Sequence, residues 1–310
     1  MTIKMTMKRG VGTKVGVIFL MVLSGVWMGC EDEIDVDLRE GEPLLVVDAW
    51  INDKPEDQVV LLSVTQSYFA REDAPQITGA SVSIRDNAGT IYTFTERGNG
   101  EYVWSPTVDT PTFGQIGNDY TLTVETGGDV YQAVSRMNRV PVIDSVTFTF
   151  EEETIFQPDS YIAEFWARDF EGPGDAYWIR AYKNGELLNL PGDINIAFDA
   201  GFSEGDFDGV TFLPPIRAGI NPDDENEEGD ELSPYWPGDS VFVEIHSITS
   251  VAFDFLNEVS IQTNRPGGFA ELFADPLANV PANLTHTNGD KGVVGFFNVA
   301  AVQGNGKRLE

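Results

Sequence analysis

Apolar and polar residues alternate along much of the chain after residue 43. Residues 44–51 (LLVVDAWI) and 58–65 (QVVLLSVT) show this pattern, and a turn-forming stretch at 52–55 separates them. Alternation of this kind is typical of β-strands that bury one face. The same pattern between glycine-rich turns predicts further strands, at 80–85, 90–95, 101–104, 119–125 and 130–135. Short strands at this spacing favour an immunoglobulin-like N-terminal β-sandwich over residues 44–141.

A second domain is predicted over residues 142–310, and it is also rich in β-structure. Strands are expected at 143–150, 161–167, 176–182, 240–247 and 293–302. A helix is predicted near 251–263, because Val251, Phe255, Leu256 and Val259 fall on one helical face. The following RPGG sequence ends that helix, since proline and glycine cannot continue it. The predicted fold class is therefore mainly β, with one short helix in the second domain.

Composition narrows the range of partners. The chain has 50 acidic and only 19 basic residues, for a net charge of −31. A field of this sign repels nucleic-acid phosphates and anionic lipid headgroups. The charge therefore argues against a nucleic-acid partner and against membrane binding through a basic patch. It indicates a well-hydrated surface. Cation binding is the more specific alternative.

The amino terminus carries the clearest functional signal. Basic residues lie among the first fourteen positions, and a short apolar run follows at 15–26. The run is shorter than the roughly 20 residues that a membrane-spanning helix needs, and its flanks suit a secretory signal peptide. It leads to Gly29-Cys30, which resembles the lipobox of bacterial lipoproteins, although Trp27 stands where that pattern usually has leucine. An ordinary cleaved signal peptide and a retained anchor helix are the alternatives.

The lipobox resemblance implies that Cys30, the only cysteine, is lipidated after removal of a signal peptide at 1–29. Residues 30–43 would then form an acidic tether between the acyl chains and the folded body. The acidic triplet at 31–33 resembles the export signal that sends lipoproteins of Bacteroidota to the outer face of the outer membrane. It is equally compatible with a plain linker. The expected location is lipid-anchored at the outer membrane and exposed at the cell surface.

Catalytic signatures are missing from the sequence. The two histidines, His246 and His286, are too few and too far apart in sequence for a zinc site, and structural roles are expected for both. The chain has no G-x-S-x-G elbow, P-loop or dinucleotide-binding glycine pattern. A pair of carboxylates that work as in a glycosidase would be invisible at this level. We therefore expect a protein that is not an enzyme and needs no cofactor.

Two segments are candidates for binding. The acidic stretch 221–231 offers oxygen ligands that suit calcium, from Asp223, Asp224, Glu225, Glu227, Glu228 and Asp230. It does not fit the EF-hand pattern, and such dense like charge is more often a solvated loop. Tyr235 and Trp236 lie in a proline-rich stretch where an exposed aromatic ring would stack on a sugar. They are the candidate ligand-binding residues.

Several strings resemble one family. LLVVDAWI, GASVSIRDNAGTIYTFTERGNGEYVW and NLTHTNGDKGVVGFFNVAAV are similar to an uncharacterised lipoprotein family of Bacteroidota, which carries the domain of unknown function forty-two forty-nine. The first half also resembles the small sandwich of carboxypeptidase regulatory-like domains. The family resemblance implies genes that neighbour TonB-dependent receptors, and hence an accessory role in nutrient capture or uptake. A carbohydrate- or calcium-binding adhesion module is the alternative, and a hydrolase with an unrecognised site is a third.

Overall fold

Strands dominate the chain, and the fold class predicted from the sequence is confirmed as mainly β with one α-helix. The computed structural model describes residues 41–67, 70–154, 158–198, 215–223, 232–265, 267–274 and 280–310. Residues 42–310 form one compact unit. The predicted signal peptide, Cys30 and most of the tether lie outside the described residues.

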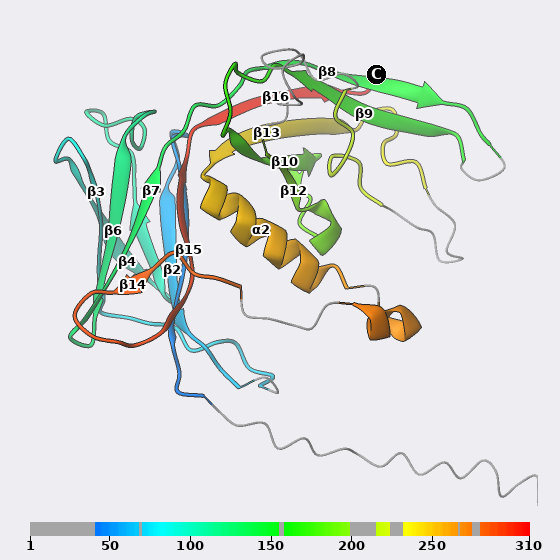
Figure 1. Cartoon of the computed structure of the whole chain (residues 1–310). Helices are drawn as coiled ribbons and strands as arrows, with labels where there is room; N and C mark the ends of the chain where they lie inside the picture. The colour runs from blue at the N-terminus through cyan, green and yellow to red at the C-terminus, as the bar shows by residue number, and fades with distance from the viewer. Residues whose placement is uncertain are drawn as a thin grey trace, which may run out of the picture. The chain divides into compact units, whose positions relative to one another are not determined.

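Nine strands form a large sheet that is nearly closed on itself (Figure 1). Along the sheet they follow the order β14 (Thr285–His286), β7 (Asp129–Arg136), β6 (Asp119–Thr126), β3 (Ser81–Asp86), β4 (Ile91–Gly98), β5 (Glu101–Trp104), β2 (Gln58–Val64), β1 (Leu45–Asn52) and β15 (Val293–Ala300). A hydrogen bond from Val299 N to Ser135 Oγ, 3.0 Å long, joins β15 to β7 and helps to close the sheet.

The specific immunoglobulin-like sandwich expected for residues 44–141 is not confirmed. Strand β4 pairs with β3 on one side and with β5 on the other, so the ladder continues around the curve. Alternation along β1 shows how the core is filled. Its residues Leu45, Val47, Ala49 and Ile51 are buried, while Asp48 between them is exposed. The predicted strand periodicity therefore held locally, because successive side chains point to opposite faces.

A second sheet contains β11 (Glu186–Leu187), β10 (Ala176–Lys183), β13 (Ser240–Ile248) and β16 (Val302–Arg308) in that order, with β12 (Asn195–Phe198) also paired to β10. An Asn184-Gly185 turn joins β10 to β11, and both residues have positive φ, as a tight hairpin requires. A hairpin of β8 (Ile143–Glu151) and β9 (Ser160–Ala167) contributes to the same hydrophobic core as β10 and β13.

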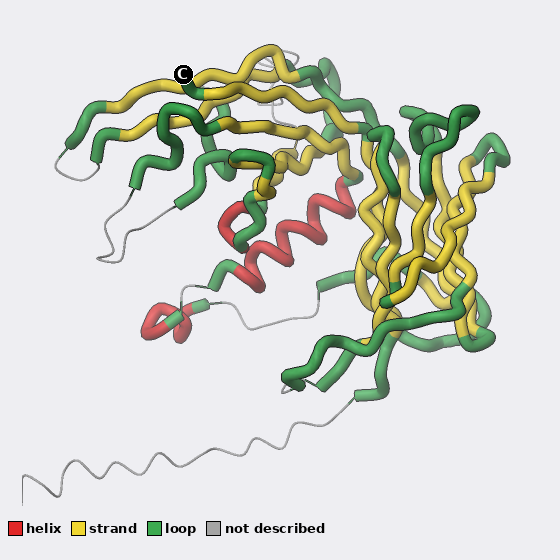
Figure 2. The backbone as a smooth tube through the Cα atoms, turned by 180° about the vertical axis from the view of Figure 1, so that it is seen from behind, coloured by secondary structure: helices red, strands yellow, loops and turns green. Residues whose placement is uncertain are grey.

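The helix α2 (Ser250–Thr263) lies where the sequence predicted it, and it contacts β10, β12 and β15 (Figure 2). Thr249 caps it, since its Oγ1 accepts a 3.2 Å hydrogen bond from Ala252 N. The buried side chains are Ala252 and Leu256, whereas Val251 is exposed. The buried face of the helix therefore includes Ala252, and the prediction that Val251 belongs to it was wrong. Two short 3₁₀ helices, η1 (Pro191–Asp193) and η2 (Gly268–Phe273), complete the described elements.

The C-terminal part of the chain returns to the large sheet. Strand β15 runs parallel to β1 over eight residue pairs, from Leu45 with Val293 to Asn52 with Ala300. Strand β14 pairs with β7. The segment predicted as a second domain, 142–310, therefore supplies two strands to the sheet that also contains the strands of 44–141. Alternation along the sequence does not reveal this return, because it does not show which strands pair.

Gly295 is the position where the parallel pair tolerates least change. Its φ is +99°, and a Cβ placed there would lie 1.9 Å from the carbonyl oxygen of Val47. Gly89 has a similar φ of +97° with nothing within 4 Å of the same position, so it is a matched control. Gly89→Ala should cost about 1 kcal/mol of unfolding free energy from backbone strain alone.

Gly295→Ala should cost at least about 2 kcal/mol more, because the two strands must also move apart. Urea unfolding followed by circular dichroism measures both values. Equal losses for the two variants would contradict the close approach of β1 and β15.

Candidate functional site: the polar–aromatic face of the second sheet

Strands β10 and β13 bring aromatic and charged side chains together. Their antiparallel register places Trp178 opposite His246, Arg180 opposite Glu244, and Tyr182 opposite Phe242. Side chains opposite each other in a sheet share a face. We call this set of six residues the polar–aromatic face. The intervening residues of β10, Tyr177, Ile179 and Ala181, point the other way and are buried in the main core.

Phe242 forms one end of this face and is 42% exposed. Its ring lies over Gly304 and Gly306 of β16, where an added Cβ would come within 2.6 Å and 2.8 Å of ring carbons. Larger residues at either glycine would push the ring away. Tyr182 stands beside it, with the two ring centroids 6.1 Å apart. The glycines of β16 therefore keep a flat aromatic surface in place at the rim of the sheet.

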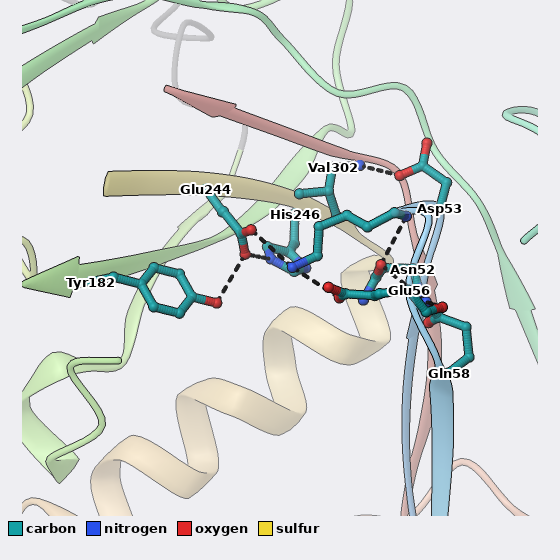
Figure 3. A network of polar contacts seen from close by, with 9 residues as sticks. Asn52, Asp53, Glu56, Gln58, Tyr182, Glu244, His246 and Val302 are labelled. Atoms are coloured by element: carbon teal, nitrogen blue, oxygen red, sulfur yellow. Dashed lines mark hydrogen bonds and ion pairs between the residues drawn. The ribbon is translucent and has the colours of Figure 1, made fainter. Parts of the chain in front are cut away.

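Glu244 is the most connected residue of the face, although only 4% of its surface is exposed (Figure 3). Its Oε1 is 2.9 Å from Lys54 Nζ. Its Oε2 lies 3.0 Å from His246 Nε2 and accepts a 3.1 Å hydrogen bond from Tyr182 OH. Both carboxylate oxygens therefore have partners, which a buried charge requires.

Lys54 comes from the turn between β1 and β2, so this ion pair links the large sheet to the second sheet. The turn is itself ordered by side chains, because Asn52 Oδ1 accepts from Lys54 N at 2.9 Å. Asp53 Oδ1 accepts from Val302 N of β16 at 2.8 Å, a second link between the sheets (Figure 3). Glu56 lies 2.9 Å from Lys54 Nζ at the solvent side.

Burial and pairing act in opposite directions on the Glu244 carboxyl. Burial alone would raise the pKa of Glu244, but hydrogen bonds from His246 and Lys54 and the positive charge of Lys54 lower it to about 2. Burial lowers the pKa of His246, which opposes charging of the ring. A neutral His246 then donates its Nε2 proton to the ionised Glu244. The pKa of Lys54 is raised, because its two carboxylate partners outweigh the effect of burial.

Arg180 is held differently from the other charged residues. Its guanidinium carbon lies 4.9 Å from the centroid of the Trp178 ring, within cation–π range. Its Nε is buried and has no hydrogen-bond partner among the described residues. The face thus combines a satisfied, rigid acidic centre with an arginine whose donors stay available. Such an arrangement suits binding.

Of the two residues predicted to form an aromatic ligand site, Trp236 is exposed and Tyr235 is buried. Trp236 is 55% exposed, as a stacking residue would need to be. Tyr235 is fully buried, and its hydroxyl donates to the carbonyl oxygen of Ile220. Its ring also packs against Phe148, with centroids 5.2 Å apart. The ligand-binding role predicted for Tyr235 is corrected on these grounds, because its side chain belongs to the core.

The calcium prediction falls almost wholly outside the described residues. Asp223 is described and exposed, whereas Asp224, Glu225, Glu227, Glu228 and Asp230 lie outside the described residues. In the parts of the chain that are described, no three His, Cys, Asp or Glu side chains are grouped to hold a metal. No helix within those same parts has the length and apolar character needed to cross a membrane.

His286 and an open pocket lie at one end of the large sheet. The His286 side chain is almost buried, stacks on Tyr131 with centroids 4.8 Å apart, and accepts a 2.9 Å hydrogen bond at Nδ1 from Lys291 N. The pocket, about 790 Å³, has Tyr131 and Lys291 in its lining. Lys291 Nζ is already 2.5 Å from Asp129, so its charge is satisfied. The polar–aromatic face is therefore the better candidate.

Sequence reasoning missed Lys54, Arg180 and Glu244. The available signal was the two strings WIRAY and FVEIH, in which aromatic and charged residues recur at every second position. Such recurrence places them on one strand face. It does not say that the two strings pair, nor that a turn residue from β1–β2 reaches them. Those facts come from the register and from the ion pair.

The described chain is a mainly β protein with a nearly closed large sheet and a second sheet that packs against the helix α2. The second sheet carries the polar–aromatic face. The family model described as Domain of unknown function (DUF4249) matches residues 31–305. The chain belongs to this family. No curated protein matches the chain.

The low pKa of Glu244 can be tested by measuring how its contribution to stability changes with pH. Glu56, which also pairs with Lys54, provides the control. A depressed pKa means that this carboxylate stabilises the fold above its ordinary value of 4.5, and that the stabilisation is lost as the pH falls toward about 2. Glu244→Gln should lower the unfolding free energy by about 3 kcal/mol near neutral pH, since it breaks a buried pair. The difference from the unchanged protein should shrink below pH 4.5.

Glu56→Gln is the control, because Glu56 pairs with the same lysine but its side chain is 49% exposed. It should cost less than about 1 kcal/mol at any pH. Urea titrations across the acid range measure both variants. A Glu244→Gln deficit that stays constant from neutral to acid pH would contradict the depressed pKa.

Proposed function

We propose that this protein is a non-enzymatic lipoprotein of the outer membrane, anchored by acyl chains on Cys30 and exposed at the cell surface. In this proposal it works as an accessory partner of a TonB-dependent receptor in nutrient capture or uptake. The observation that carries the proposal is the order of features at the amino terminus. Basic residues, a short apolar run at 15–26 and Gly29-Cys30 follow one another as in lipoprotein precursors.

The position of the first strand supports an anchored body. Fourteen residues lie between Cys30 and Leu45, where β1 begins. A fully extended chain of that length spans about 50 Å, so the body stays near the bilayer. The net charge of −31 gives the body no attraction to anionic headgroups. Multiple acyl chains provide the firm attachment that the surface charge cannot.

The receptor partnership draws its support from the family. The resemblance noted in the sequence implies genes beside TonB-dependent receptors, and membership of the DUF4249 family makes that context relevant to this chain. Both carboxylate oxygens of Glu244 are engaged by neighbouring side chains, which favours binding over acid–base chemistry at the polar–aromatic face.

A carbohydrate- or calcium-binding adhesion module is the second candidate. The observation in its favour is Trp236, which is 55% exposed and therefore available for stacking on a sugar. A module of this kind would bind a glycan without a receptor. Binding of purified protein to glycans in the absence of any barrel protein distinguishes it from the first candidate.

Lipidation is tested by changing the cysteine and by improving the motif. Cys30→Ser should abolish acylation, so the protein should leave the membrane fraction and lose labelling by a fatty-acid analogue. Trp27→Leu is the matched control, because it brings the motif closer to the lipobox pattern and should leave processing intact or faster. Unchanged fractionation and labelling of Cys30→Ser would contradict the anchor.

The receptor partnership is tested by purifying the native protein in a gentle detergent and identifying companions by mass spectrometry. A TonB-dependent receptor should be recovered with the unchanged protein and should be depleted with Cys30→Ser, because the unanchored body is no longer held at the membrane. Recovery of no barrel protein, under conditions that preserve a known receptor complex from the same membrane, would contradict the partnership.

A further inference from the structure

The chain has 50 acidic residues, yet Arg180 has no hydrogen-bonded partner among the residues that the structure describes. Some of the other described arginines form carboxylate pairs, such as Arg139 with Asp175 at 2.6 Å and Arg217 with Glu164. No hydrogen bond or ion pair to a described residue is found for Arg180, and its Nε is buried without a partner. The donors of Arg180 are therefore not used within the described chain, and those that reach solvent can bind a ligand.

The carboxylate across the sheet from Arg180 is already engaged by other residues. Glu244 lies directly opposite Arg180 in the register of β10 and β13. Its Oε1 faces Lys54, and its Oε2 receives both His246 and Tyr182. With these partners in place, Glu244 leaves the guanidinium donors of Arg180 unused. Lys54 already supplies the positive charge that faces Glu244, so Glu244 does not need Arg180 as a partner.

The surroundings restrict where a ligand can approach. The Trp178 ring covers one flat side of the guanidinium. Of the Arg180 nitrogens, only Nε is both buried and unpartnered, so the terminal nitrogens keep contact with solvent. On the same face, Phe242 lies across from Tyr182 and is half-exposed. Its ring packs over Gly304 and Gly306. A donor fork and a flat apolar surface therefore lie side by side.

We propose that the polar–aromatic face binds a small carboxylate that carries a flat apolar surface. The terminal nitrogens of Arg180 receive the carboxylate, since a guanidinium matches that group with two parallel hydrogen bonds. Phe242 and Tyr182 receive the flat part, either an aromatic ring or the apolar side of an acidic sugar. This inference goes beyond the proposed function, which assigns no ligand, and it does not depend on the membrane anchor.

The test uses the full-length mature protein in detergent and isothermal titration with two carboxylates, benzoate and D-galacturonate. Their uncharged counterparts, benzamide and D-galactose, are the controls. We expect saturable binding of at least one carboxylate and binding of its counterpart about tenfold weaker or worse, because a charge-assisted hydrogen-bond pair is lost. Benzoate alone points to an aromatic acid, and galacturonate alone points to an acidic sugar.

Variants separate Arg180 from general effects of charge. Arg180→Gln should weaken carboxylate binding about tenfold or more, and Arg180→Lys should recover only part of it, because an ammonium lacks the planar fork. Arg136→Gln is the matched control: its side chain is 53% exposed, pairs with Asp119 at 3.0 Å and lies on β7 in the large sheet. It should bind the carboxylate as the unchanged protein does.

Phe242→Ala gives an independent reading if Arg180→Gln fails to fold, since Phe242 is at the rim and half-exposed. It should weaken binding of the preferred carboxylate while leaving the thermal unfolding temperature nearly unchanged. The proposal is overturned by any of three results: no saturable binding of either carboxylate, equal binding of the neutral counterparts, or equal affinity in folded Arg180→Gln. A soluble Cys30→Ser protein that still binds would show that anchoring and ligand binding are separate properties.

Discussion

The parallel pairing of β1 with β15 is the constraint on which the rest of the structure depends. It joins residues 45–52 to residues 293–300, so almost the whole described chain lies between the two strands. A parallel pair needs a crossover connection, and closing so long a loop costs conformational entropy. Burial on both faces of β15 offsets that cost. Phe297 and Val299 enter the main core, while Phe296 lies in the second cluster.

The outer side of this pair organises the second sheet. Trp50 of β1 stacks on Phe296 of β15 at 5.6 Å, and it meets Trp178 of β10 at 5.0 Å. Phe255 of α2 packs against Phe296 at 4.5 Å. The aromatic ring that supports Arg180 is thus itself supported by the strands that close the large sheet. The ion pair between Lys54 and Glu244 adds a polar link beside this apolar one.

Much of the strand content was readable from the sequence, because alternation is a local property. Strands β1, β2, β3, β6 and β7 lie close to where the pattern placed them. Strand β16 was missed, since its sequence VQGNGKR has glycines that are usually depleted in strands. Here the glycines are needed, because the ring of Phe242 occupies the space above them. The glycines of β16 are thus explained by a side chain of β13, which the sequence of β16 alone does not show.

The candidate site was harder to predict than the fold, and for a related reason. Alternation shows which residues of one strand share a face, but it does not identify the strand alongside. Arg180 and Glu244 are 64 residues apart, and Lys54 approaches from a turn in the other sheet. Tyr235 shows the opposite error, since an aromatic residue in a proline-rich stretch suggested exposure and the ring is buried.

Native-state amide hydrogen exchange at increasing denaturant tests most directly whether the β1–β15 pair holds the second sheet in place. Amides in β1, β15, β10 and β13 should merge into one opening reaction with a shared free energy, because the strands belong to one cooperative unit. Exchange of β10 and β13 through a separate, lower-energy opening, while β1 and β15 stay protected, would contradict the account. The polar–aromatic face would then be held by its own sheet alone.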